Sequence, residues 1–176
     1  MDGSTDDLRI QLLGGLQVRV GPRPVHESEW RLRKTKSLVK LLALACGHQL
    51  HREQLMELLW PEQDPDAAAN NLHKALYAAR RALEPHLAPA TPSVYLHLQG
   101  DLLVLRSPGP LWIDVDAFAQ AAAEARRAGK PRAYLEALQL YTGDLLPEDR
   151  YEDWAAGRRE ELQALHRLAG AVRRRC

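Results

Sequence analysis

The chain of 176 residues is poor in cysteine and aromatic side chains and has no long apolar run. Its two cysteines, Cys46 and Cys176, are too few for a disulfide framework, and neither has zinc-site spacing to another ligand. No apolar run approaches the roughly 18 residues that span a bilayer, and the polar, acidic start lacks the basic segment of a secretory leader. These absences predict a soluble protein of a reducing cytoplasm, away from membranes.

The short motifs of common enzyme classes are also missing. The sequence contains no HExxH, GxxxxGK[ST], GxSxG or GxGxxG pattern. Asp114 and Asp116 flank Val115, but no further calcium-loop ligands follow, and Asp116 is expected to cap a helix instead. We therefore expect no enzyme activity, no cofactor and no metal site.

The single phenylalanine contrasts with abundant leucine and alanine, a composition that favours helices over a β-sandwich. The net charge of +1 hides an uneven distribution. Residues 31–85 carry nine Lys and Arg against six Asp and Glu, whereas residues 111–172 carry eight against eleven. The stretch from Arg31 to Lys40 holds five basic residues and no acid, a patch of the kind that meets phosphate.

Hydrophobic periodicity and turn residues predict a mainly helical chain with two small β-hairpins. The first hairpin is expected within Leu8 to Val20, around Gly14-Gly15. Helices are expected at 34–46, 51–60 and 65–83, the second hairpin at 93–106, and further helices at 117–128, 132–141 and 151–172. Cys46 falls on the apolar stripe of the first helix and is expected to be buried.

The third helix carries the functional signal. Asp64 is a favourable N-cap and Pro65 suits the first helical position. On a helical wheel the apolar residues Leu72, Leu76, Ala79 and Leu83 share a narrow arc. The opposite face carries Asn70, Lys74, Tyr77 and Arg81, with His73 and Arg80 on one flank and Asn71 on the other.

These side chains are suited to DNA, because Asn can bond adenine, Lys and Arg can reach guanine or phosphate, and Tyr can contact sugar–phosphate. A short helix, a brief connection and this helix form a helix-turn-helix, and the following hairpin would be a wing. The alternative is an ordinary solvated helix face. The basic stretch and the flanking hairpins favour DNA recognition.

At the level of motifs, residues 8–106 resemble the OmpR-type winged helix of SARP-family transcriptional activators. The matching segments are Leu12-Leu13-Gly14-Gly15-Leu16, Arg52-Glu53-Gln54-Leu55, Leu59-Trp60-Pro61, Asn70-Asn71-Leu72-His73-Lys74-Ala75-Leu76 and Ala79-Arg80-Arg81-Ala82-Leu83-Glu84-Pro85. Residues 111–170 resemble the start of the bacterial transcriptional activator domain of that family, and this domain is expected at 111–176, after a linker at 107–110. Its matching segments are Trp112-Ile113-Asp114-Val115-Asp116-Ala117-Phe118, Leu140-Tyr141-Thr142-Gly143-Asp144-Leu145-Leu146-Pro147 and Tyr151-Glu152-Asp153-Trp154.

The resemblance implies a winged helix-turn-helix followed by TPR-like α-helical hairpins, the second domain being truncated. It implies a transcription activator that binds direct-repeat promoter sites in double-stranded DNA, self-associates there, contacts RNA polymerase and is cytoplasmic, on the nucleoid. The implied base-facing residues are Asn70, Asn71, His73, Lys74 and Tyr77, and the implied phosphate contacts are Arg31, Arg33, Lys34, Trp60, Arg80 and Arg81.

Two departures from the family pattern stand out. The expected wing tip, Leu98-Gln99-Gly100-Asp101, lacks the arginine that many such wings insert into the minor groove, and Ala75 and Ala78 replace longer polar side chains. Two other functions remain open. One is a protein–protein adaptor whose winged helix does not bind DNA, and the other is the N-terminal regulatory segment of a larger signalling ATPase.

Overall fold

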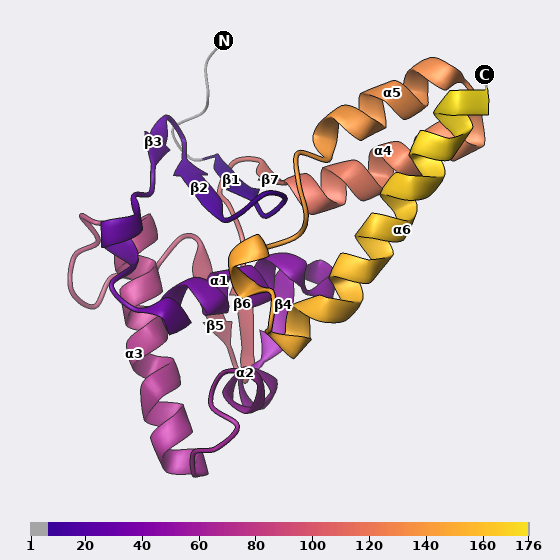
Figure 1. Cartoon of the computed structure of the whole chain (residues 1–176). Helices are drawn as coiled ribbons and strands as arrows, with labels where there is room; N and C mark the ends of the chain where they lie inside the picture. Colours follow the sequence, from indigo (N-terminus) through magenta and orange to yellow (C-terminus); the bar gives the residue numbers. More distant parts are fainter. Residues whose placement is uncertain (1–6, 176) are drawn as a thin grey trace. The chain divides into compact units, whose positions relative to one another are not determined.

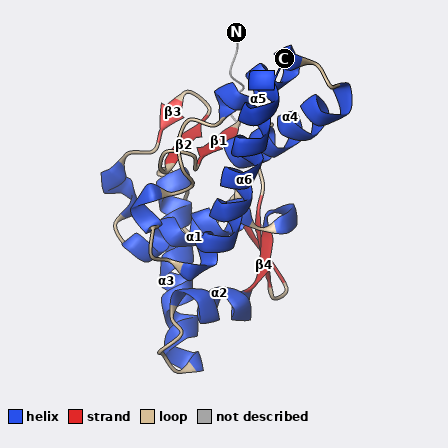
Figure 2. Cartoon of the chain, turned by 45° about the vertical axis from the view of Figure 1, so that its right-hand side comes forward, coloured by secondary structure: helices blue, strands red, loops and turns tan. Residues whose placement is uncertain are grey.

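The computed structural model describes residues 7–175, which divide into two compact units (Figure 1). The first unit contains Val18–Leu111 together with the residues up to Arg9, and the second contains Ile10–Gln17 together with the chain from Trp112 onward. Helices are the main regular secondary structure of both units, and the strands are short (Figure 2). Cys176 lies outside the described residues.

Four strands of the chain form one small sheet in the order β3-β2-β1-β7. The expected first hairpin is present as β1 (Leu8–Gln11) and β2 (Gln17–Val20). Two further strands, β3 (Arg23–Pro24) and β7 (Leu111–Ile113), have only two and three residues. They were not predicted, because so few residues show no alternation that could mark a strand.

The rest of the first unit is a winged helix. A 3-10 helix η1 (Glu27–Trp30) precedes α1 (Arg33–Leu44), α2 (Arg52–Leu59) and α3 (Pro65–Leu83), and the three α-helices contact one another. The sheet beside them has the order β4-β6-β5, from β4 (Gln49–His51), β6 (Leu102–Leu105) and β5 (Leu96–Gln99). β5 and β6 are the predicted second hairpin.

The first helix ends two residues earlier than expected. Ala45 leaves helical geometry, and its N–H bonds the carbonyl of Leu41 at 3.0 Å. A 3-10 turn η2 (Cys46–His48) follows, in which Gly47 has a φ of 65°. Cys46 therefore sits outside the helix and is exposed, so its predicted burial was wrong.

The second unit consists of α4 (Asp114–Ala128), α5 (Pro131–Leu140), a 3-10 turn η3 (Pro147–Asp149) and α6 (Asp153–Arg175). α4 and α5 form a helical hairpin around Gly129, whose φ is 64°, and α6 contacts both helices (Figure 1). A small apolar core joins them through Ala125, Tyr134 and Ala169. The helical domain predicted after the linker is thus present. Its last helix begins at Asp153 rather than at Tyr151.

The start of α4 corrects a second prediction. The helix begins at Asp114 instead of Ala117, and Asp116 lies inside its first turn rather than at its cap. The carboxylate of Asp114 is buried and accepts hydrogen bonds from the backbone N–H groups of Leu12 (2.9 Å) and Leu13 (2.9 Å). Burial raises the pKa of Asp114, and these backbone N–H donors oppose that rise. Asp114 thus holds the turn of the first hairpin.

A tyrosine holds the loop between α5 and α6 within the second unit. The ring of Tyr141 stacks on His166 with centroids 4.2 Å apart and lies 5.2 Å from the buried ring of Phe118. Its hydroxyl donates to Asp144 at 2.9 Å. Burial, together with the neighbouring Asp144 carboxylate, raises the pKa of Tyr141 to about 12. The phenol therefore stays protonated and keeps donating at neutral pH.

Two glycines, Gly14 and Gly143, allow the turn between β1 and β2 to lie close to the loop between α5 and α6. The N–H of Gly14 donates to the carbonyl of Asp144 at 2.8 Å, and the hydroxyl of Thr142 donates to the carbonyl of Leu13 at 2.9 Å. A Cβ on Gly143 would lie 2.9 Å from the Cα of Gly14. Only a hydrogen fits between these two backbones.

Gly143→Ala should therefore destabilise the protein by about 1–3 kcal/mol, because the added methyl group meets backbone that cannot move aside. The matched control is Gly157→Ala in α6, where nothing lies within 4 Å of the added Cβ. That change should stabilise by about 0.5–1 kcal/mol through helix propensity. Denaturant unfolding of both variants measures the sign of each change in stability. Equal changes for Gly143→Ala and Gly157→Ala would contradict the close contact between Gly14 and Gly143.

Candidate nucleic-acid interface

Helix α3 has the boundaries that its sequence predicts. The side chain of Asp64 accepts a hydrogen bond from the N–H of Ala67 at 3.0 Å, and Pro65 occupies the first helical position. The helix ends at Glu84, where the backbone N–H bonds the carbonyl of Arg80. These 19 residues give a helix about 28 Å long.

The two faces of α3 differ sharply. Its buried residues are Ala68, Leu72, Ala75, Leu76, Ala78, Ala79, Ala82 and Leu83. Pro65 and the acidic Asp66 are exposed in its first turn, and from residue 70 onward the exposed side chains are polar or cationic and follow helical spacing: Asn70, His73, Lys74, Tyr77 and Arg81. We call these five residues the α3 stripe. Tyr77 is 64% exposed, which is unusual for a large aromatic side chain without a partner to cover it.

Burial of Ala75 and Ala78 explains one departure from the family pattern. Both alanines lie on the face of α3 that packs inside the unit, with 2% and 9% of their surface exposed. A longer polar side chain at either position would have to enter that packing. These positions therefore take no part in the α3 stripe.

Two predicted contact residues are engaged elsewhere. The side-chain amide of Asn71 donates to Gln63 in the connection between α2 and α3, at 2.5 Å. The guanidinium of Arg80 donates to the carbonyl of Leu96 on β5 through Nε (3.1 Å) and Nη2 (3.0 Å). Burial lowers the pKa of Arg80, and the carboxylate of Glu84 opposes that shift. Arg80 therefore fastens the wing to α3.

Glu84 makes a second connection between α3 and the wing. Its carboxylate accepts hydrogen bonds from the hydroxyl of Ser93 and from the N–H of Val94 (3.2 Å). The same hydroxyl accepts from the N–H of Tyr95 and of Leu96, where β5 begins. The start of the wing is thus fixed to the C-terminal end of the helix.

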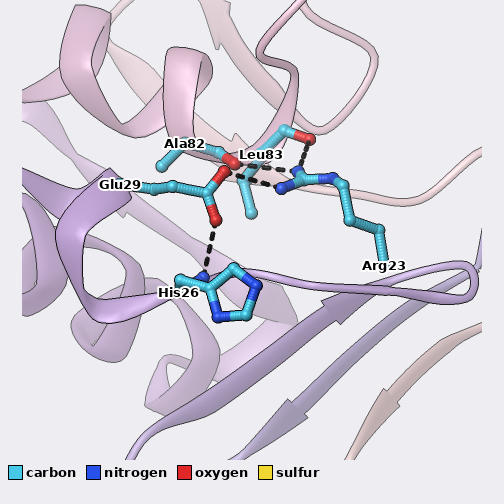
Figure 3. Close-up of polar contacts among 5 residues, drawn as sticks. All are labelled: Arg23, His26, Glu29, Ala82 and Leu83. Atoms are coloured by element: carbon cyan, nitrogen blue, oxygen red, sulfur yellow. Dashed lines mark hydrogen bonds and ion pairs between the residues drawn. The ribbon is translucent and has the colours of Figure 1, made fainter.

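An arginine from β3 caps that end (Figure 3). The Nη2 of Arg23 donates to the carbonyls of Ala82 and Leu83, each at 2.9 Å, and Nη1 pairs with Glu29 at 2.8 Å. The second oxygen of Glu29 accepts from the backbone N–H of His26 at 2.6 Å. A cation at the C-terminal end of a helix satisfies free carbonyls and opposes the negative end of the dipole.

The remaining predicted phosphate contacts belong to other segments than α3. Arg31 and Arg33 are exposed and Lys34 is half-buried, around the N-terminus of α1. Trp60 is half-buried at the end of α2, in a hollow that Glu53 and Glu57 also line. Two carboxylates thus lie beside Trp60, whereas Arg31, Arg33 and Lys34 stand near one carboxylate, Glu27, which pairs with Lys36.

The wing is short, and the residues of its tip carry no cationic side chain. Gly100 turns the hairpin with a φ of 61°, and Leu98 and Asp101 beside it are exposed. Arg52 lies 4.0 Å from the carboxylate of Asp101. The tip residues themselves include no arginine, but the side chain of Arg106 also reaches the tip, where it donates to Gln99.

Sequence patterns did not identify the residues that orient α3. Arg23 follows a Gly-Pro turn and belongs to a two-residue strand, so no periodicity distinguished it. Glu84 and Ser93 meet only because the chain folds back between them. Only the tertiary structure brings these groups to the end of α3.

Arg23→Ala should destabilise the first unit by about 1–3 kcal/mol, since it leaves two helix carbonyls and the carboxylate of Glu29 without their charged partner. Arg23→Lys keeps the charge but loses the planar guanidinium group, so its stability should lie between those of the wild-type chain and Arg23→Ala. Arg19→Ala is the control, because exposed Arg19 donates to the carbonyl of Pro22, only three residues away. Denaturant unfolding measures the stability of all three variants. If Arg19→Ala lowers the free energy of unfolding as much as Arg23→Ala does, the capping role of Arg23 is refuted.

Comparison with known proteins shows a similarity of fold. No family model matches the chain, and no curated protein matches it closely. It is similar to Mycobacterium tuberculosis EmbR, a SARP-family regulator, in the structure of EmbR in complex with a low-affinity phosphopeptide. The TM-score is 0.76 at 22% identity, over 94% of this chain and 44% of EmbR. The fold is therefore SARP-like, a winged helix plus a helical domain, and the chain spans less than half the length of that relative.

Proposed function

We propose that the chain is a sequence-specific regulator of transcription, an activator, that binds double-stranded DNA through α3. The α3 stripe is the observation that carries this proposal. Five polar or cationic side chains follow one face of a helix whose other face is packed, and the helix is held at its end by Arg23. A rigid helix of this kind fits the major groove.

Each residue of the α3 stripe has a suitable partner in DNA. The amide of Asn70 can bond adenine through two atoms, and Lys74 can reach guanine O6 and N7. His73 and Tyr77 can bond base edges or sugar–phosphate. Arg81 is exposed near the end of the helix, where its Nη1 bonds the carbonyl of Leu87, and its remaining donors suit a phosphate.

The other predicted DNA contacts differ in how well their surroundings suit DNA binding. Arg31, Arg33 and Lys34 remain predicted phosphate contacts. Arg80 and Asn71 are better suited to positioning, because their side chains hold β5 and the helix-turn-helix connection. The acidic neighbours of Trp60 disfavour a phosphate beside it.

The likeness to EmbR supports a regulatory role for this fold. In the proposed function the helical unit makes protein contacts, with RNA polymerase among its partners, and the DNA sites are direct repeats in promoters on the nucleoid. No helix within residues 7–175 has the length and apolar character of a membrane span. A group of three metal-ligating side chains is likewise absent from that range.

Selection of bound duplexes from a random DNA pool tests the proposal. The wild-type chain should enrich a common sequence, and the double variant Lys74→Ala/Arg81→Ala should not, because each lost contact costs about 1–3 kcal/mol. Arg127→Ala/Lys130→Ala removes equal charge from exposed positions of the second unit and should leave the selection unchanged. If the wild-type chain enriches no sequence, the adaptor alternative is favoured.

The salt dependence of binding gives a second prediction. Binding to the selected duplex should weaken steeply as salt rises, because neutralised phosphates release counterions. Arg81→Ala should lower the slope of log K against log salt by about 1, whereas Asn70→Ala should weaken binding with little change of slope. Fluorescence anisotropy at several salt concentrations measures both slopes; equal slopes for both variants would argue against a phosphate contact by Arg81.

A further inference from the structure

A hollow of about 360 Å³ opens where α2 meets the connection to α3. Its apolar lining comes from Met56, Trp60, Pro61, Pro65 and Ala68, and Glu53, Glu57 and Gln63 complete it. We call this the acidic pocket. Its volume lies at the lower end of the roughly 300–1,000 Å³ range of ligand sites.

Negative charge surrounds the acidic pocket. The segment from Glu53 to Asp66 carries five carboxylates and no lysine or arginine. All five, Glu53, Glu57, Glu62, Asp64 and Asp66, are exposed. Carboxylates repel DNA phosphates, so this surface does not suit a nucleic acid. Its chemistry suits an apolar side chain flanked by cations.

The first unit presents such a group between η1 and α1. Leu32 is 57% exposed, and Arg31, Arg33 and Lys34 flank it. Arg31 has a φ of 58° and a ψ of −50°, an uncommon backbone conformation for a residue with a side chain. The chain on its N-terminal side is anchored by buried Trp30. We call residues 31–34 the basic knob.

The basic knob and the acidic pocket belong to opposite ends of α3. Glu29, two residues before the knob, meets Arg23, and Arg23 caps the carbonyls of Ala82 and Leu83 at the C-terminal end. The pocket includes Pro65 and Ala68 at the N-terminal end. The helix between them is about 28 Å long. A folded chain therefore does not place its own knob in its own pocket.

We propose that the basic knob of one copy docks in the acidic pocket of a second copy. Leu32 enters the apolar lining beside Trp60, and Arg31 and Lys34 meet Glu53 and Glu57. The contact joins two different surfaces, so it is heterologous and can add further copies in the same orientation. In such an assembly the knob cations face carboxylates, so the docked state and the phosphate contacts predicted for the same side chains exclude one another.

This inference rests on the first unit alone and is tested without DNA, so it stands or falls separately from the proposed function. Cysteine trapping tests the pairing directly. In full-length chains carrying Cys46→Ser and Cys176→Ser, Leu32→Cys is placed in one copy and Met56→Cys in a differently tagged copy. A short bis-maleimide should join them, and mass spectrometry should locate the link between positions 32 and 56.

The control for trapping uses Leu135→Cys with Met56→Cys. Leu135 is also a partly exposed leucine, but it lies on α5 and is not flanked by basic residues on both sides. A linked 32–56 product at least ten times more abundant than the 135–56 product supports the proposal. Equal yields overturn it.

Charge exchange then tests the electrostatic part. Glu53→Lys/Glu57→Lys and Arg31→Glu/Lys34→Glu should each weaken self-association at least tenfold in sedimentation velocity, with unchanged circular dichroism. A mixture of the two variants should regain dimers, because each supplies the charge that the other now needs. Loss of dimers without recovery in the mixture overturns the proposal, and so does self-association that neither variant changes. A pocket that serves a different partner protein would give neither trapping nor recovery.

Discussion

The direction in which α3 presents its exposed side chains depends on the bonds at its C-terminal end. One guanidinium, that of Arg23, satisfies two terminal carbonyls, and Glu29 holds that guanidinium in place. Arg80 and Glu84 bind the wing to the same end of the helix. A helix that projects five exposed side chains needs a fixed orientation, since a small rotation would move every one of them relative to a binding partner.

The second unit uses similar bonds around the turn of the first hairpin. Buried Asp114 receives the N–H groups of Leu12 and Leu13, and Gly143 leaves room for Gly14. Arg159 of α6 donates to the carbonyl of Leu145 at 2.9 Å. In both units, charged side chains satisfy backbone groups that lie outside regular helices and strands. Such bonds fix loops that would otherwise leave buried polar groups without partners.

Charge divides the surface of the first unit. The α3 stripe carries Lys74 and Arg81 and the basic knob carries three cations, whereas the segment from Glu53 to Asp66 is acidic. The near-zero net charge of the chain therefore says little about its partners. Two surfaces of opposite charge can serve two partners, because each attracts what the other repels.

The sequence by itself determined the helices with strong periodicity and clear ends. Asp64, Pro65 and the spacing of Leu72, Leu76 and Leu83 predicted both the bounds and the packed face of α3, because those properties depend on neighbours within the same helix. The predicted DNA contacts of its exposed face stay a prediction. The predicted domain bounds at 106 and 111 also stay a prediction, whereas compactness places Ile10–Gln17 with the helical unit.

Only the tertiary structure decided which polar side chains bond backbone groups from distant parts of the chain. The sequence predicted a helix cap for Asp116 and burial for Cys46, whereas Asp114 makes the buried contact and Cys46 is exposed. It placed Arg80 among the phosphate contacts, and the structure bonds that side chain to Leu96. No pattern in the sequence identified Arg23 as the residue that caps the C-terminal end of α3. A long polar side chain can reach many partners from one position, and its choice depends on backbone groups that folding brings near from distant parts of the chain.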